Sequence, residues 1–183
     1  MSAVTDLFQP LPRDMPRDAF MQLFGGVYEH SPWVAEGVWR DGLRERHDDV
    51  DGLAAAMTEV VNATNMTKRM ALIKAHPDLA GRAAIAGELT AESSSEQASA
   101  GIDQCTPAEF ERFTKLNTHY KRRFGMPFIM AVRGSNRHDI LAAFEQRIDN
   151  DPSTEFTHAM NEIHKIARLR LAAIAEAQRE ERI

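Results

Sequence analysis

The stretch from Ala75 to Gly101 reads AHPDLAGRAAIAGELTAESSSEQASAG. Proline disfavours helical dihedral angles in the residue before it, so Pro77 ends the helix expected over residues 67–75 at His76. Thr90 has a side chain suited to capping a helix that runs to about Ala100. The stretch therefore predicts a helix end, an alanine- and glycine-rich connector over 78–89 with a short helix, and a new helix start.

Outside this stretch, apolar residues recur at helical spacing and no alternating strand pattern is present. The other predicted helices cover residues 17–28, 32–42, 50–62, 107–124, 136–148 and 154–180. Ser31 and Thr106 are expected as N-caps, and Gly125 as the end of the helix before it. The continuous apolar run at 126–132 is expected to be buried, extended or irregular chain. The sequence thus predicts an all-α fold: a compact single-domain bundle of about eight helices over residues 1–183, with no sheet and with an irregular N-terminal arm over 1–15.

Composition narrows the class of protein. The 183 residues carry a net charge of −5, and no basic stripe of the kind that nucleic-acid binders show is present. There is one cysteine, so neither an internal disulfide nor a cysteine-based zinc site is expected. No apolar run approaches the ~20 residues of a membrane span, and no secretory signal precedes the first helix. We expect a cytoplasmic protein without nucleic-acid or membrane partners.

His76 allows two interpretations. A histidine at a helix C-terminus interacts favourably with the helix dipole, and such positions are common without any catalytic role. The same field stabilises the protonated imidazole, which suits a general acid.

The segment Ser93-x-x-Glu96 is a capping box by pattern. If the helix instead begins at Thr90, then Ser93, Glu96 and Gln97 share one face at spacings of three and four residues. A hydroxyl, a carboxylate and an amide then project together, as a small polar ligand requires.

Two arginines, Arg168 and Arg170, lie among apolar residues of the last helix. Either both extend to solvent, or one points inward and binds an anion; spacing does not decide. The seven histidines lack the spacing of known metal ligands, so no metal site is expected. Phosphate-binding glycine loops and hydrolase nucleophile motifs are also absent.

Several blocks together resemble the OHCU decarboxylases, where OHCU is 2-oxo-4-hydroxy-4-carboxy-5-ureidoimidazoline, an intermediate of urate breakdown. The blocks begin with HPDLAGRAA and LTAESSSEQASAGID, which start at His76 and Leu89. They continue with YEHSPWVAE (28–36), FTKLNTHYKRRFGMPFIMAVRG (113–134), ILAAFEQRIDN (140–150) and EIHKIARLRL (162–171). Family order is kept over about residues 17–175, and Met126 stands where the family usually has phenylalanine.

The resemblance implies an all-α homodimer that needs no cofactor and converts OHCU to (S)-allantoin and CO2. By residue-to-residue match, His76 is expected to be the proton donor, with Glu96 as a second catalytic group. Arg170 is expected to be the inward arginine, with Arg168 as the alternative. The expected substrate-binding residues are Pro77, Ser93, Ser94, Ser95, Gln97, Phe128, Ile129, Met130, Ala131, Val132 and Arg170. A non-catalytic ligand-binding protein and a ureide hydrolase of the same pathway are the alternative functions, although a hydrolase would need an activated water for which no metal ligands are evident.

Overall fold

The computed structural model describes residues 6–81 and 87–181. Part of the connector expected to hold a short helix, residues 82–86, lies outside the described residues. The described residues form eight α-helices: α1 Arg17–Phe24, α2 Trp33–Asp41, α3 Val50–Asn62, α4 Met66–Lys74, α6 Ala91–Ser99, α7 Pro107–Phe124, α8 Arg137–Arg147 and α9 Pro152–Glu180. Within the same residues there is no sheet, only an isolated bridge between Leu7 and Asp49. The all-α prediction is confirmed.

The described chain divides into two compact units. The first unit contains residues up to 72 and from 164 onward, and the second contains residues 73–163. The first twelve residues of α9 belong to the second unit and the remainder of the helix to the first. Among the described helices, none is long and apolar enough to cross a membrane.

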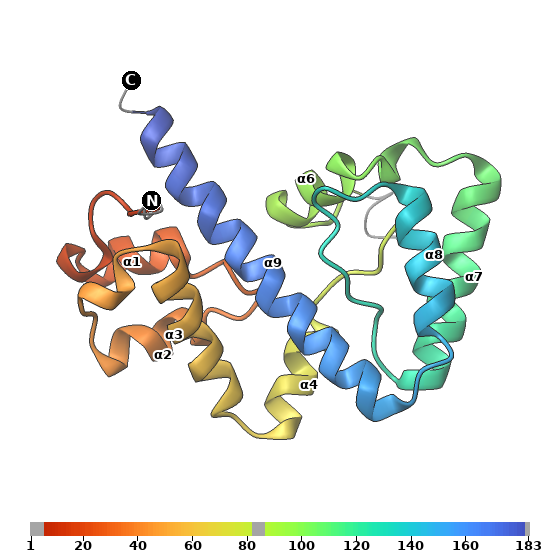
Figure 1. Ribbon diagram of the computed structural model, residues 1–183, viewed down its shortest axis with the longest axis horizontal. Coiled ribbons are helices and arrows are strands. Elements are labelled where there is room, and N and C mark those ends of the chain that lie inside the picture. The colour runs from red at the N-terminus through yellow and green to blue at the C-terminus, as the bar shows by residue number, and fades with distance from the viewer. Residues whose placement is uncertain (1–5, 82–86, 182–183) are drawn as a thin grey trace, which may run out of the picture. The chain divides into compact units, whose positions relative to one another are not determined.

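In the first unit, α2 contacts both α1 and α3 (Figure 1). The N-terminal arm is irregular, yet its described part is anchored there. The Phe8 N–H donates to Asp48 O at 2.9 Å, and the Phe8 ring is completely buried with its centroid 5.0 Å from that of Phe24. Burying an aromatic side chain contributes about 2–3 kcal/mol, so the arm is part of this unit's core.

Two helix starts and one helix end differ from the sequence prediction. The first helix ends at Phe24 rather than near Tyr28, where Gly25 and Gly26 follow with their low helix propensity. Ser31 does not cap α2: the helix begins at Trp33 after Pro32 without a side-chain cap, and the Ser31 hydroxyl donates to Glu29 O at 2.8 Å. The last helix begins at Pro152 rather than 154, since the Asp151 carboxylate accepts the Thr154 N–H at 3.0 Å and Pro152 takes the first helical position.

The predicted ends of α7 are confirmed. Thr106 and Glu109 form a reciprocal capping box, in which each side chain accepts the other residue's N–H. Gly125 ends the helix in the left-handed conformation, with a φ of +69°, that glycine adopts without steric cost.

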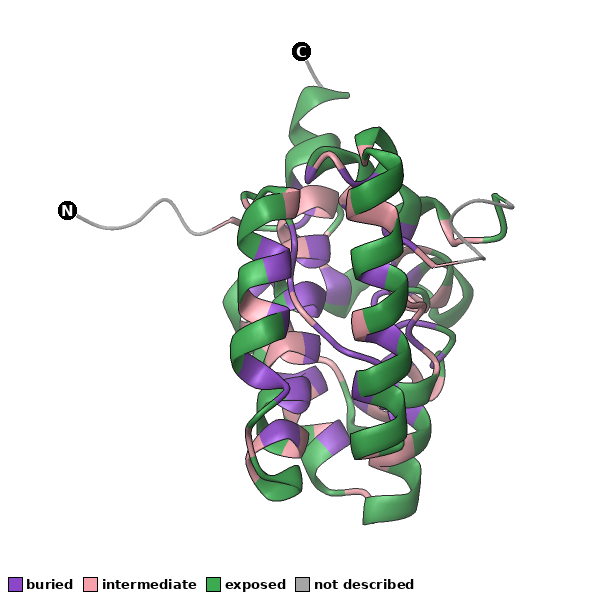
Figure 2. Ribbon diagram, turned by 90° about the vertical axis from the view of Figure 1, so that its right-hand side faces the viewer, coloured by how far each residue is buried: buried purple, intermediate pink, exposed green. Residues whose placement is uncertain are grey.

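The core of the second unit is aromatic. Helices α7 and α8 contact each other (Figure 1), and their buried positions form interrupted stripes in Figure 2. Phe128 stacks on Phe144 with ring centroids 3.8 Å apart and planes 14° apart, and Tyr120 meets both rings edge-on. The ring of Phe128 therefore ties the chain after α7 to α8.

Residues 126–132 are irregular, and all except Met130 are buried, as the sequence predicts. Arg147 of α8 holds this segment: its Nη1 donates to Ile129 O at 2.7 Å, and its guanidinium lies 4.3 Å from the Phe128 ring centroid. The same guanidinium forms an ion pair with Glu155, with Nη2 and Oε2 2.9 Å apart.

Glu155 is completely buried, and its carboxylate accepts hydrogen bonds from Arg147, Tyr120 and Asn150. Burial by itself raises the pKa of Glu155, but the hydrogen bonds from these three donors outweigh it and the net pKa is lowered. The carboxylate is therefore ionised at neutral pH, and the buried charge is compensated.

Removing the Glu155 carboxylate should strongly destabilise the protein, because it leaves the Arg147 charge buried without its partner. We expect Glu155→Ala to lower the free energy of unfolding by about 3–5 kcal/mol. The exposed pair Arg112–Glu145 provides the control, and Glu145→Ala should cost less than about 1 kcal/mol. Chemical denaturation of both variants measures the difference, and equal losses would contradict the assigned role of Glu155.

Candidate active site

His76 lies in a loop just beyond α4. The helix ends at Lys74, and the His76 N–H donates to Ile73 O at 3.1 Å in a closing turn. The His76 side chain is buried, with a relative exposure of 9%. Three residues after Pro77, Ala80 has a φ of +52°, a left-handed conformation that costs a non-glycine residue about 1–2 kcal/mol. Other contacts must hold this loop in place.

Helix α6 begins where the sequence predicts. The Thr90 hydroxyl accepts the Ser93 N–H at 3.2 Å, so Thr90 is the N-cap, and Ser93 lies inside the helix. Ser93 and Gln97 are each 5% exposed and Glu96 is half-buried, whereas Ser94 and Ser95 are exposed. The three-residue polar face is therefore confirmed, and the run of serines is divided between two sides of the helix.

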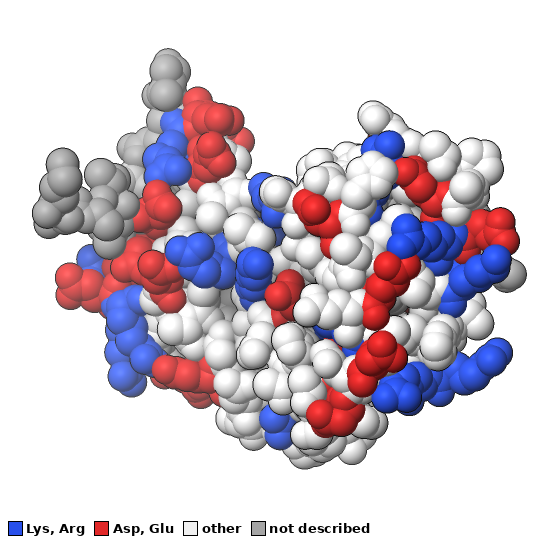
Figure 3. All heavy atoms as spheres, turned by 45° about the vertical axis from the view of Figure 1, so that its right-hand side comes forward, with Lys and Arg blue, Asp and Glu red and all other residues white. Residues whose placement is uncertain are grey.

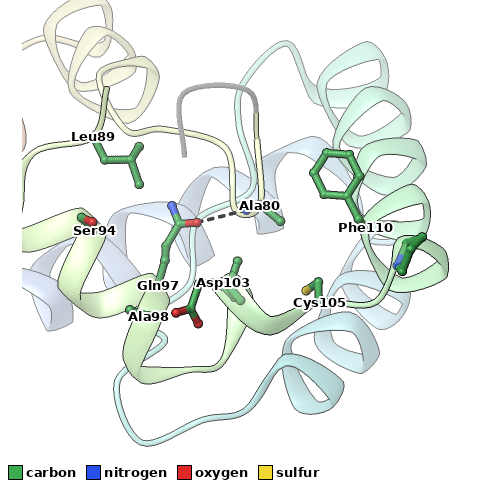
Figure 4. Close-up of a pocket in the computed structure, with 10 residues that line it drawn as sticks. Ala80, Leu89, Ser94, Gln97, Ala98, Asp103, Cys105 and Phe110 are labelled. Carbon is green, nitrogen blue, oxygen red and sulfur yellow. Dashed lines mark hydrogen bonds between the residues drawn. The ribbon is translucent and has the colours of Figure 1, made fainter. Parts of the chain in front are cut away.

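Gln97 connects α6 to the loop after His76. Its Oε1 accepts the Ala80 N–H at 3.1 Å, drawn as the dashed line in Figure 4, and its Nε2 donates to Asp78 O at 3.4 Å. An amide nitrogen carries two protons, so Gln97 can make both bonds and still donate once more. Gln97 thus joins the loop to the polar face of α6 by hydrogen bonds.

Asn117 of α7 also holds the loop, and it is not among the residues predicted from the sequence. Its Nδ2 donates to Leu79 O at 2.8 Å, and its exposure is 5%. The signal that could have revealed it is its register: Phe113, Asn117 and Tyr120 lie four and three residues apart on the buried face of α7. A polar residue in an apolar stripe requires a buried partner.

A cavity of about 610 Å³ borders this assembly (Figure 4). Its lining includes two of the expected site residues, Ser94 and Gln97, but neither His76 nor Glu96. Cys105 also faces this cavity, and burial, together with the nearby charge of Glu109, raises the pKa of its thiol. The thiol is therefore protonated at neutral pH and a weak nucleophile. The described residues that line it are Ala80, Leu89, Ser94, Gln97, Ala98, Ile102, Asp103, Cys105, Pro107 and Phe110.

The backbone of residues 128–132, expected to line the substrate pocket, is fixed by two charged side chains. Arg147 donates to Ile129 O, and the Glu162 carboxylate of α9 accepts the Ala131 N–H at 2.6 Å. Phe128, Ile129, Ala131 and Val132 are buried, and Met130 is half-buried. Neither Arg147 nor Glu162 was predicted, because sequence spacing does not reveal contacts 18 and 31 residues apart.

The structure decides which arginine of α9 points inward. Arg170 is 5% exposed, and its Nη1 donates to Glu29 Oε2 at 2.9 Å and to Val27 O at 3.3 Å within the first unit. Arg168 is exposed and pairs with Asp51 at 2.8 Å. The guanidinium that is desolvated and paired is therefore that of Arg170.

Charges on the face in Figure 3 alternate in sign, with lysines and arginines interspersed among aspartates and glutamates. In the part of the chain that the structure describes, no three His, Cys, Asp or Glu side chains come close enough to hold a metal ion. The side chains that bind the loop Asp78–Ala80 are the amides of Gln97 and Asn117 and the ammonium of Lys121.

An all-α chain with a histidine-bearing loop fastened to a hydroxyl, carboxylate and amide face has the groups that an enzyme needs for a small polar substrate. The sequence profile of the OHCU decarboxylases matches residues 13–172, which include most of both units. The chain belongs to the OHCU decarboxylase family.

Individual relatives agree with this assignment. A 2-oxo-4-hydroxy-4-carboxy-5-ureidoimidazoline decarboxylase of Haloferax volcanii is 45% identical over 85% of this chain and 88% of the relative. The enzyme of the same name from Amia calva is 36% identical over 87% of this chain and 89% of its own length. The crystal structure of an (S)-allantoin synthase matches with a TM-score of 0.70 and 34% identity, covering 89% of this chain and 52% of the synthase, about half of its length.

The capping role of Thr90 determines which residues of α6 share a face, and it can be tested directly. We expect Thr90→Ala to lower the free energy of unfolding by about 1 kcal/mol, because an N–H at the helix start loses its acceptor. Thr118→Ala, the same change at an exposed position of α7, should cost less than about half of that. Denaturant titrations measure both, and an unchanged Thr90→Ala variant would mean that α6 is capped from another residue.

Proposed function

We propose that this protein catalyses the decarboxylation of OHCU to (S)-allantoin in urate degradation, without a cofactor. The observation that carries the proposal is the fastening of the His76 loop to the polar face of α6 through Gln97. This fastening supports the proposal, because it links the loop that follows the proposed proton donor to the proposed substrate-binding face in a member of the OHCU decarboxylase family.

The chemistry of OHCU explains why these groups suffice. When the bond to the carboxylate breaks, its electron pair forms a double bond to the neighbouring ring carbon, and the C=N pair of that carbon moves onto nitrogen. CO2 leaves, and the nitrogen takes up a proton. The neighbouring carbon then gains a proton on one face while the hydroxyl loses its proton and becomes the carbonyl of allantoin. One proton is consumed in total, and the ring itself accepts the electrons, so the protein must orient the ring and supply that proton.

His76 is proposed as the proton donor that sets the configuration of the product. A positioned acid contributes roughly 10²–10⁴-fold to such a step. Glu96, half-buried on α6, is proposed to engage the substrate hydroxyl and accept its proton as the carbonyl forms. Ser93 and the second N–H of Gln97 are proposed to hold the ring and ureido groups, with Pro77 packed against them.

The remaining expected residues support binding in different ways. The backbone of Phe128–Val132 is fixed by Arg147 and Glu162, which suits it to present amide and carbonyl groups to a ureide. Arg170 is proposed to bind the substrate carboxylate, because a buried guanidinium is a strong donor to an anion. Ser94 and Ser95 remain proposed contacts, although both side chains are exposed.

We further propose that the two units together are a single OHCU decarboxylase domain over residues 1–183, supported by the family match across both. A cytoplasmic homodimer without nucleic-acid or membrane partners is proposed from the family resemblance, the net charge of −5 and the single cysteine.

The function is tested by generating OHCU from urate with the upstream enzymes and following its decay by circular dichroism. Wild-type protein should accelerate the decay and yield optically active allantoin. We expect His76→Asn to lower kcat by roughly 10²–10⁴-fold, because the acid is lost. His119→Asn, a change at an exposed histidine of α7, should retain full activity. Racemic allantoin forming at the spontaneous rate with wild-type protein present would refute the function.

The role of Arg170 is tested by comparing two arginines of one helix. Arg170→Lys should raise KM by about tenfold or more, because lysine lacks the planar fork that binds a carboxylate through two hydrogen bonds. Arg168→Lys should leave KM and kcat within about twofold, since its partner is the surface residue Asp51. Steady-state kinetics with OHCU give both constants, and equal effects would exclude a specific role for Arg170.

A further inference from the structure

We propose that Asn117 is a positioning residue for the decarboxylation and acts through the loop Asp78–Ala80 on His76. This inference rests on the proposed function, because it concerns the placement of the proposed proton donor. Asn117 is buried and polar, and it is not among the site residues expected from the family resemblance.

Buried side-chain amides bind polar groups of two successive peptide units of the loop, 78–79 and 79–80. Gln97 of α6 binds Asp78 O and the Ala80 N–H, and Asn117 of α7 binds Leu79 O. Gln97 alone could not do this, because its two bonds leave the carbonyl between them unsupported. Asn117 therefore supplies the hold on the middle of a loop whose Ala80 is in an unfavourable left-handed conformation.

The Asn117 amide has one sensible orientation. A carbonyl oxygen only accepts, so Nδ2 and not Oδ1 must face Leu79 O. Its own Oδ1 is buried and has no hydrogen-bond partner among the described residues. A buried polar atom without a partner costs about 1–3 kcal/mol, a penalty that leucine at this position would avoid. The unpaired Oδ1 of Asn117 therefore destabilises the fold, whereas its Nδ2 provides the hydrogen bond to Leu79 O.

The ion pair between Lys121 and Asp78 also contacts the loop, but it contributes less than the amide bonds. Lys121 Nζ lies 2.6 Å from Asp78 Oδ2, but their side chains are 47% and 25% exposed. Exposed ion pairs of this kind contribute at most about 1 kcal/mol. The buried amide bonds, rather than this ion pair, define where the loop lies.

The path from Asn117 to His76 is short and stiff. Only two residues lie between His76 and Leu79, and one of them is Pro77, whose ring fixes its φ near −65°. We therefore expect a shift at Leu79 to reach His76. An error of about 1 Å in the position of a catalytic group can cost about 10²-fold in rate.

The test compares Asn117→Leu with Thr118→Val in the OHCU assay. Thr118 neighbours Asn117 on α7, lines the same cavity of about 600 Å³, and donates its hydroxyl to Thr114 O of its own helix. We expect Asn117→Leu to lower kcat by about 10–100-fold with KM within about twofold, because substrate-binding groups remain in place. Thr118→Val should retain both constants.

A second variant separates positioning from stability. Asn117→Asp has nearly the same shape, but its ionised carboxylate cannot donate to Leu79 O, whereas the protonated carboxyl can. The ratio of its kcat to the wild-type kcat should therefore rise as the pH falls from 8 to about 5.5. A purely structural role would leave that ratio unchanged. Hydrogen exchange of the Ala80 amide should be faster in Asn117→Leu than in Thr118→Val.

The outcomes are distinct. If wild-type protein fails to accelerate OHCU decay, the proposed function is wrong, and the positioning role falls with it. If wild-type protein is active but Asn117→Leu keeps kcat within about twofold, only the positioning role is overturned. Should Asn117→Leu fail to fold, the pH dependence of Asn117→Asp decides the question, since a flat ratio overturns the proposal and a rising one supports it.

Discussion

Buried backbone that lies outside any helix must find hydrogen-bond partners, and the second unit is organised around that requirement. Two stretches of this unit lie outside the helices and belong to the candidate site: the loop Asp78–Ala80 and the segment Phe128–Val132. Side chains from the surrounding helices provide the partners: Gln97 and Asn117 for the loop, Arg147 and Glu162 for the segment. The helices of this unit therefore form the core and also supply the side chains that bind the non-helical backbone.

Amide and charged side chains that bind this backbone differ in the cost of burying them. The amides of Gln97 and Asn117 can be buried at moderate cost because they are neutral. Arg147 can be buried only because Glu155 compensates its charge, and Glu155 is in turn surrounded by donors. The guanidinium combines three contacts: an ion pair, a hydrogen bond to Ile129 O and a stacking contact with Phe128. Lysine, with a single rotatable ammonium, could not reproduce that geometry.

The sequence predicts features whose causes are local. Thr90 and Thr106 cap helices within three residues of themselves, and Gly125 ends a helix through its own dihedral angles, so these were predictable. The predicted cap Ser31 was wrong, since α2 begins one residue later than expected, at Trp33 after Pro32. The supports of the candidate site were also missed, as they bridge long distances along the chain: 38 residues separate Asn117 from Leu79. The inward side of α9 was ambiguous by spacing alone, and the burial of Arg170 against Glu29 decided it.

The lowered pKa of Glu155 links the integrity of the second unit to protons. A carboxyl whose pKa is lower in the folded than in the unfolded chain binds fewer protons when folded, so acid favours unfolding. Its contribution is fully present above the unfolded value of about 4.3 and is lost as the pH falls through the folded value. In acid, the buried carboxylate becomes neutral, the Arg147 charge loses its compensation, and the hold on Ile129 O and Phe128 weakens. A falling pH therefore loosens a buried segment that lies outside any helix and depends on a side chain for its position.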